Sequence, residues 1–88
     1  MSETDTLLVF PCQFPIKAMG KSRDDFDAIV VEIIRRHVGD IREGAVTSRP
    51  SRSGTYTAVT VVIEATSREQ LNAIYQGLTD CPDVLMAL

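Results

Sequence analysis

Two stretches of helical periodicity, set between segments that alternate, constrain the fold of this chain more than any other feature. The first runs from Phe26 to His37, where apolar residues recur three or four positions apart along one helix face. Ser22, with Asp25 three residues later, predicts the amino-terminal cap of this helix, and Gly39 predicts its end. The stretch is therefore a helix that packs one side on a core.

The second helical stretch begins after Ser67, whose spacing from Gln70 is that of a capping box. Pro82 prevents this helix from continuing, so the residues after it must adopt another structure. The apolar stripe of the second helix comprises Leu71, Ile74, Tyr75 and Leu78.

The segments around the two helices carry the signals of strands and of one turn. Residues 14–20 and 55–65 alternate between two faces, as strands with one buried face do. Residues 41–47 predict a weaker strand, because a glycine and charged residues interrupt its apolar pattern. Strands at the edge of a sheet commonly carry such charges. Residues 48–54, rich in Ser, Arg, Pro and Gly, predict a hairpin connector, and residues 84–88 predict a short last strand.

The predicted order is β-α-β-β-α-β, an α+β arrangement. With right-handed crossovers it becomes a ferredoxin-like sandwich, a four-stranded antiparallel sheet of order 4-1-3-2 with two helices on one face. The chain has 88 residues, which is enough for one small domain. We expect residues 13–88 to form that domain and residues 1–12 to be an arm that packs onto it or frays.

Composition and charge exclude several classes of protein. Hydrophobic residues make up 44% of the chain, but no window approaches the roughly 18 apolar residues of a membrane span. The amino terminus lacks the basic start of a secretory signal, so we expect a cytoplasmic protein with no membrane contact. The net charge of −3 argues against general nucleic-acid binding. Cys12 and Cys81 lack the spacing of a metal or redox site and are expected to be reduced thiols at opposite ends of the sheet.

No catalytic constellation is recognisable, so we predict a protein that is not an enzyme and uses neither metal nor cofactor. His37 is the single histidine, and its place at a helix end suits the helix dipole. Ser51 and Ser53 are not part of a G-x-S-x-G motif. The carboxylates at the start of the first helix, Asp24, Asp25 and Asp27, are explained by helix capping.

One candidate ligand site lies at the end of the sheet that carries the first strand–helix turn. The predicted topology gathers there the amino end of the first helix and several cationic side chains, which together suit a carboxylate or phosphate. A solvated basic hairpin is the alternative, and the nearby aspartates weaken the positive field. The residues of this predicted anion site are Gly20, Lys21, Arg49 and Arg52.

A candidate interface lies on the sheet face that the helices do not cover. Its mixed, partly apolar surface suits self-association or docking to another protein, whereas a tolerated open face or cover by the arm are the alternatives. The residues expected there are Lys17, Met19, Tyr56, Ala58, Val62 and Leu85, together with Thr60 and Ala87. RNA-recognition modules use the same topology and stack bases on aromatic residues, but only Tyr56 is available here. RNA or single-stranded nucleic-acid binding is therefore the alternative function.

Several segments resemble the YbeD-like family of small bacterial proteins, and the similarity extends over residues 10–88. They are Phe10-Pro11, residues 14–20 (Phe-Pro-Ile-Lys-Ala-Met-Gly), residues 51–56 (Ser-Arg-Ser-Gly-Thr-Tyr), residues 70–75 (Gln-Leu-Asn-Ala-Ile-Tyr) and the ending Val-Leu-Met-Ala-Leu. The resemblance implies a ferredoxin-like fold similar to the amino-acid-sensing ACT domains, which bind ligands near the first strand–helix turn. It also implies a regulatory role connected with lipoate metabolism. We therefore predict a regulatory or adaptor module that binds a protein partner or itself, with a small anionic or amino-acid-like ligand as a further candidate.

Overall fold

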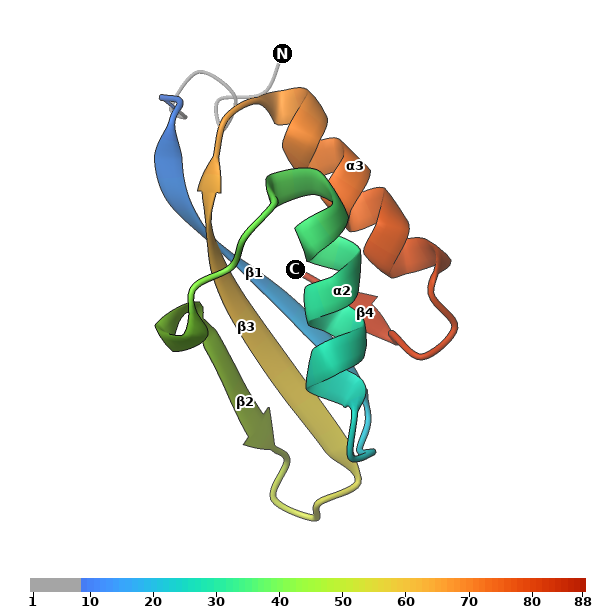
Figure 1. Cartoon of the computed structure of the whole chain (residues 1–88). Helices are drawn as coiled ribbons and strands as arrows, with labels where there is room; N and C mark the ends of the chain where they lie inside the picture. The colour runs from blue at the N-terminus through green and yellow to red at the C-terminus, as the bar shows by residue number, and fades with distance from the viewer. Residues whose placement is uncertain (1–8) are drawn as a thin grey trace.

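The computed structural model describes residues 9–88, and its elements follow the predicted order. The sheet has the order β2-β3-β1-β4 with antiparallel neighbours, which is the predicted 4-1-3-2 order counted from the other edge. Both helices lie on one face of the sheet (Figure 1), so the predicted ferredoxin-like sandwich is confirmed. The elements are β1 (Cys12–Lys21), α2 (Phe26–Val38), the short 3-10 helix η1 (Glu43–Ala45), β2 (Val46–Pro50), β3 (Tyr56–Ala65), α3 (Arg68–Asp80) and β4 (Met86–Ala87).

The hydrophobic core lies between the helices and the face of the sheet that they cover. In β1 and β3 buried residues alternate with more exposed ones, so that one face of each central strand points into the core. Among the residues that the structure describes, no polar or charged residue is buried. The largest fully buried side chains are Phe26, Ile16, Ile34, Leu71, Ile74, Leu78, Val30, Val59 and Val61.

The start of α2 differs from the prediction, whereas its end agrees. Asp25 is the cap residue and makes no side-chain capping hydrogen bond. Ser22 instead continues the sheet: its N–H donates to the Thr55 carbonyl at 2.9 Å, and its hydroxyl lies 2.7 Å from that of Thr57. The predicted cap at Ser22 is thus wrong, because the pairing with β3 extends two residues beyond the predicted strand, through Lys21 to Ser22. Gly39 ends α2 with a positive φ of 77°, as predicted.

The predicted cap of α3 at Ser67 is confirmed, and the Gln70 side chain reaches back to the N–H one residue before the cap rather than to that of Ser67. The Ser67 hydroxyl accepts a hydrogen bond from the Gln70 N–H at 3.1 Å, and the Gln70 side-chain oxygen accepts one from the Thr66 N–H at 2.8 Å. The Gln70 amide also donates to the His37 carbonyl at 3.1 Å. A single glutamine therefore joins the first turn of α3 to the last turn of α2.

The strand β2 lies at the sheet edge, as predicted, but it is shifted along the chain. The Ala45 N–H donates to the Arg42 carbonyl at 3.0 Å, which closes a tight turn where the strand was expected to begin. Pairing with β3 starts only at Val46 and continues through Pro50. Arg49 and Pro50 thus belong to the strand rather than to the connector, and Pro50 is tolerated because it lies at an edge.

The last strand is shorter than predicted, and its faces are reversed. Main-chain hydrogen bonds join Leu88 to Lys17 at 2.8 and 3.0 Å, so the pairing continues past the end of β4. Within β4, Ala87 lies opposite the buried Ala18 and therefore on the face that the helices cover. The expectation that Ala87 lies on the open face is wrong, and Met86, opposite Met19, takes that position.

Gly20→Ala is expected to destabilise the fold, since a Cβ at this position would meet the Asp83 carbonyl oxygen and a Phe26 ring carbon 2.5 Å away. Overpacking of this kind costs about 1–3 kcal/mol in the free energy of unfolding. Gly44→Ala is the control, because a Cβ there meets nothing within 4 Å. Urea unfolding of both variants checks the prediction, and equal transition midpoints would contradict it.

Candidate binding surface

Alternate residues of the four strands build the sheet face that the helices leave bare, here called the open face. The register sets Met19 beside Ala58 and Met86, and Lys21 beside Tyr56. Because paired residues point to the same side of a sheet, the whole face follows from this register. Its residues are Gln13, Pro15, Lys17, Met19, Lys21, Thr47, Arg49, Tyr56, Ala58, Thr60, Val62, Glu64 and Met86.

Large apolar side chains lie exposed on this open face. Met19, Tyr56 and Val62 are exposed by 39%, 40% and 38%, and Met86 by 52%. Met19 and Met86 are neighbours on adjacent strands, and methionine side chains adapt their shape to different partners. A soluble surface does not need so many exposed apolar side chains in one place, so the open face is a candidate contact surface for another molecule.

The charges on the open face differ from those of the rest of the chain. Lys17, Lys21 and Arg49 lie on this face, and Glu64 is its acidic residue. The chain as a whole has a net charge of −3. Acidic residues lie instead on the two helices and the loops beside them, where they include Asp25, Asp27, Glu32, Glu69, Asp80 and Asp83. The open face is therefore the basic side of an acidic protein.

The structure brings most of the predicted interface together. Lys17, Met19, Tyr56, Ala58 and Val62 all lie on the open face. Leu85, by contrast, is exposed in a bend just before β4. Val84 is buried, so strict alternation would place Leu85 and Ala87 on the open face. The bend at Leu85 shifts the alternation by one residue and places Met86 there instead, which the sequence pattern did not predict.

The predicted anion site is divided between the two sides of the sheet. Lys21 and Arg49 lie on the open face, and Arg52 is exposed in the turn between β2 and β3. Gly20 is buried on the opposite side, where the Phe26 ring and the Asp83 carbonyl cover it. At this end of the sheet Lys21 and Arg49 thus share a face with Tyr56, whereas the first helix lies on the other face. Anion binding by these cations stays a prediction.

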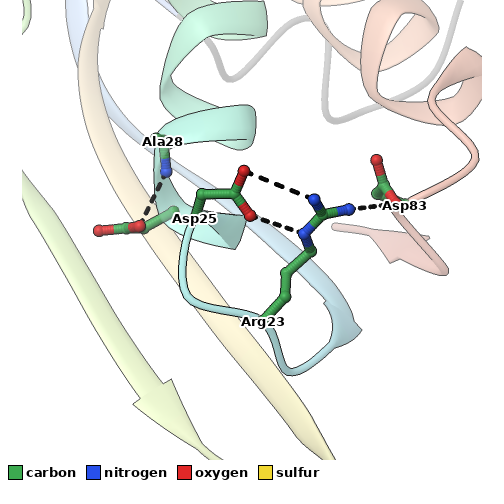
Figure 2. Close-up of polar contacts among 5 residues, drawn as sticks. Arg23, Asp25, Ala28 and Asp83 are labelled. Atoms are coloured by element: carbon green, nitrogen blue, oxygen red, sulfur yellow. Dashed lines mark hydrogen bonds and ion pairs between the residues drawn. The ribbon is translucent and has the colours of Figure 1, made fainter.

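The amino end of α2 is occupied by the chain's own carboxylates (Figure 2). Arg23 Nε lies 2.6 Å from Asp25 Oδ1, and Arg23 Nη1 lies 3.1 Å from Asp83 Oδ1. The hydrogen bond to Asp25 and the charges of both carboxylates raise the pKa of Arg23 above its ordinary value. An Asp27 oxygen accepts the Ala28 N–H at 2.9 Å. The link from Arg23 to Asp83 joins residues distant in the sequence, so no local pattern could have predicted it.

The described residues hold no cluster of side chains that could bind a metal ion. Residues 9–88 contain no group of at least three His, Cys, Asp or Glu side chains that could hold a metal ion. His37 lies in the last turn of α2, where a cation suits the helix dipole, and Cys12 and Cys81 are free thiols. None of the helices in this part of the chain has both the length and the apolar character to cross a membrane.

Comparison with known proteins identifies the relatives of this chain. Residues 5–88 match the family described as "Protein of unknown function (DUF493)". The chain belongs to this family. A UPF0250 protein of Paraburkholderia phytofirmans is 45% identical over 99% of this chain and 98% of its own length. Another, from Paraburkholderia phymatum, is 46% identical over 96% of this chain and 94% of its own length.

The resemblance to the YbeD-like family is thereby confirmed for this DUF493 chain. Its fold is similar to the solution structure of protein HP0495 from H. pylori, with a TM-score of 0.74 over 100% of this chain and 96% of that one. The two sequences are only 14% identical, so this likeness concerns the fold alone.

Titration with inorganic phosphate tests the predicted anion site at the hairpin end of the open face. We expect Arg52→Gln to weaken phosphate binding several-fold, since it removes a guanidinium that is exposed in the turn. Arg23→Gln is the matched control and should leave binding unchanged, because Asp25 and Asp83 already engage that guanidinium. Amide chemical shifts of Arg49 and of residues 51–56 provide the measurement. Equal weakening by both variants would refute the placement of the site.

Proposed function

We propose that this DUF493 protein is a non-enzymatic regulatory or adaptor module that binds a different protein through its open face. The observation that carries the proposal is the combination of exposed Met19, Tyr56, Val62 and Met86 with a basic surround on an otherwise acidic chain. Apolar anchors inside a charged rim are typical of protein interfaces. The partner surface would carry apolar side chains flanked by carboxylates.

Charge favours a different protein over a second copy of this chain. Two open faces packed against each other would bring two sets of Lys17, Lys21 and Arg49 into one interface, with only Glu64 to offset them in each copy. Like charges brought together in this way oppose association. An acidic partner would gain attraction at the same positions, and its rate of association would increase at low salt.

Composition of the open face favours protein over nucleic acid. Sheet surfaces that bind single-stranded RNA stack bases on several aromatic rings. On the strands that the structure describes, Tyr56 is the aromatic residue of the open face, and Thr60 and Lys17 lie where further rings would be needed. The resemblance makes the enzymes of lipoate metabolism the first partners to test.

The open face is tested by placing a carboxylate in its apolar part. Val62→Glu should weaken partner binding by about tenfold or more, because it buries a charge among apolar groups and repels acidic ones. Asn72→Glu adds the same charge on the exposed surface of α3 and should leave binding unchanged. The tagged chain first captures partners from a lysate of the source organism, and a purified partner is then titrated with each variant. The far-ultraviolet helical signal confirms that both variants fold.

Three results would overturn the proposal. Equal partner affinity of the wild-type chain and the Val62→Glu variant would exclude the open face as the binding surface. A dimer in sedimentation that Val62→Glu dissociates would assign the face to self-association. Salt-sensitive micromolar binding of short single-stranded RNA, lost in the same variant, would assign it to nucleic acid.

A further inference from the structure

The central strand β3 extends further than its neighbour at the sheet edge. Pairing between β2 and β3 ends at Val46 opposite Val61, whereas pairing between β1 and β3 continues to Cys12 opposite Ala65. Just before β2 the chain forms the 3-10 helix η1 and is not part of the sheet. Figure 1 shows β3 and β1 continuing beyond the beginning of β2. The last residues of β3, 62–65, therefore have a strand on one side only.

The register determines which main-chain groups face this unoccupied side. The Ser51 N–H donates to the Tyr56 carbonyl at 2.7 Å, so Tyr56 directs its main-chain groups toward β2. Main-chain groups alternate in direction along a strand, so every second residue does the same, up to Val62 and Glu64. The Ala45 N–H cannot pair with the Val62 carbonyl, because it donates to Arg42. Within the described chain, no hydrogen bond joins the main chain of Glu64 to residues 40–45.

A groove of about 640 Å³ lies beside these main-chain groups. Its apolar part comprises Ile63 of β3 and the half-buried Val38, Ile41 and Ala45. Its charged residues are of both signs, with Arg42 against Asp40 and Glu64, and His37 lies among them. The groove therefore favours neither sign of charge, and it suits an uncharged peptide segment that places one apolar side chain beside Ile63.

We propose that this groove binds an extended peptide segment of a partner protein, which adds to β3 in line with β2. Strand addition supplies main-chain hydrogen bonds for affinity and a pocket for alternate side chains. The peptide residue opposite Ile63 directs its side chain toward Val38, Ile41 and Ala45. The residues before and after it pair with the main chain of Val62 and Glu64. This site shares Val62 with the open face but lies at the end of β3 opposite to Tyr56, and either surface can bind without the other.

The probe for this site is the peptide acetyl-Thr-Val-Thr-Val-Thr-amide, titrated into the full-length 15N-labelled chain. In the proposed pairing its valines enter the groove and the N–H groups of its threonines face β3. We expect a shift of the Glu64 amide signal and slower exchange of that proton with solvent. N-methylation of the third and fifth residues should abolish binding, whereas N-methylation of the two valines, whose N–H groups face away, should not.

A variant pair tests the same hydrogen bond from the protein side. Glu64→Pro removes the main-chain N–H that faces the groove without breaking a bond to β1, and should weaken peptide binding by about tenfold. Glu64→Gln keeps that N–H and should bind as the wild-type chain does. If the proline variant does not fold, the two methylated peptides decide the question.

The proposal is overturned if the Glu64 amide does not respond at millimolar peptide. Equal binding of the two methylated peptides would overturn it as well. Peptide-induced shifts confined to Met19 and Tyr56 would move the binding to the open face. Because Val62 also lines the groove, Met19→Glu, which changes the open face outside the groove, is titrated with the purified partner against Asn72→Glu, so failure of one proposal is distinguishable from failure of the other.

Discussion

The rest of the structure depends on the antiparallel pairing of β1 with β3. Ten residues of each strand pair in an uninterrupted register, from Cys12 opposite Ala65 to Lys21 opposite Tyr56. Because side chains alternate along both strands, this one register separates core residues from exposed residues across the centre of the sheet. A slip of β1 by one residue would turn Ile16 to solvent and Lys17 to the core while β3 kept its faces.

Because both helices cover the same face of the sheet, this separation of core from exposed residues leaves the other face open to contacts. Buried Phe26 and Ile74 seal the covered side, while Met19 and Met86 remain exposed on the other. The carboxylates of the helix layer and the cations of the open face give the two sides opposite character. In the function that we propose, this contrast favours a partner surface that is both apolar and acidic, which is a narrower class than exposed apolar residues alone would select.

The ends of the sheet are formed by contacts between segments distant in the sequence. Arg23 bridges Asp25 and Asp83, and so ties the first strand–helix loop to the loop before β4. At the opposite end Gln70 joins α3 to the last turn of α2. The short β2 leaves the end of β3 without a neighbour there, which creates the groove beside Glu64. One end of the sheet is thus closed by side chains, and the other retains an open strand edge.

The sequence by itself determined the order of elements, the cap of α3 at Ser67, the end of α2 at Gly39 and most of the open face. These features follow from local periodicity and from the backbone preferences of single residues, which act over a few positions. Only the tertiary structure decided the role of Ser22, the position of β2, the face of Met86 and the burial of Gly20. Each of these depends on where strands begin to pair or on a neighbour far along the chain, such as Asp83. The local conformational preferences of the residues do not predict such contacts, because the contacts form only when the helix layer and the sheet pack together.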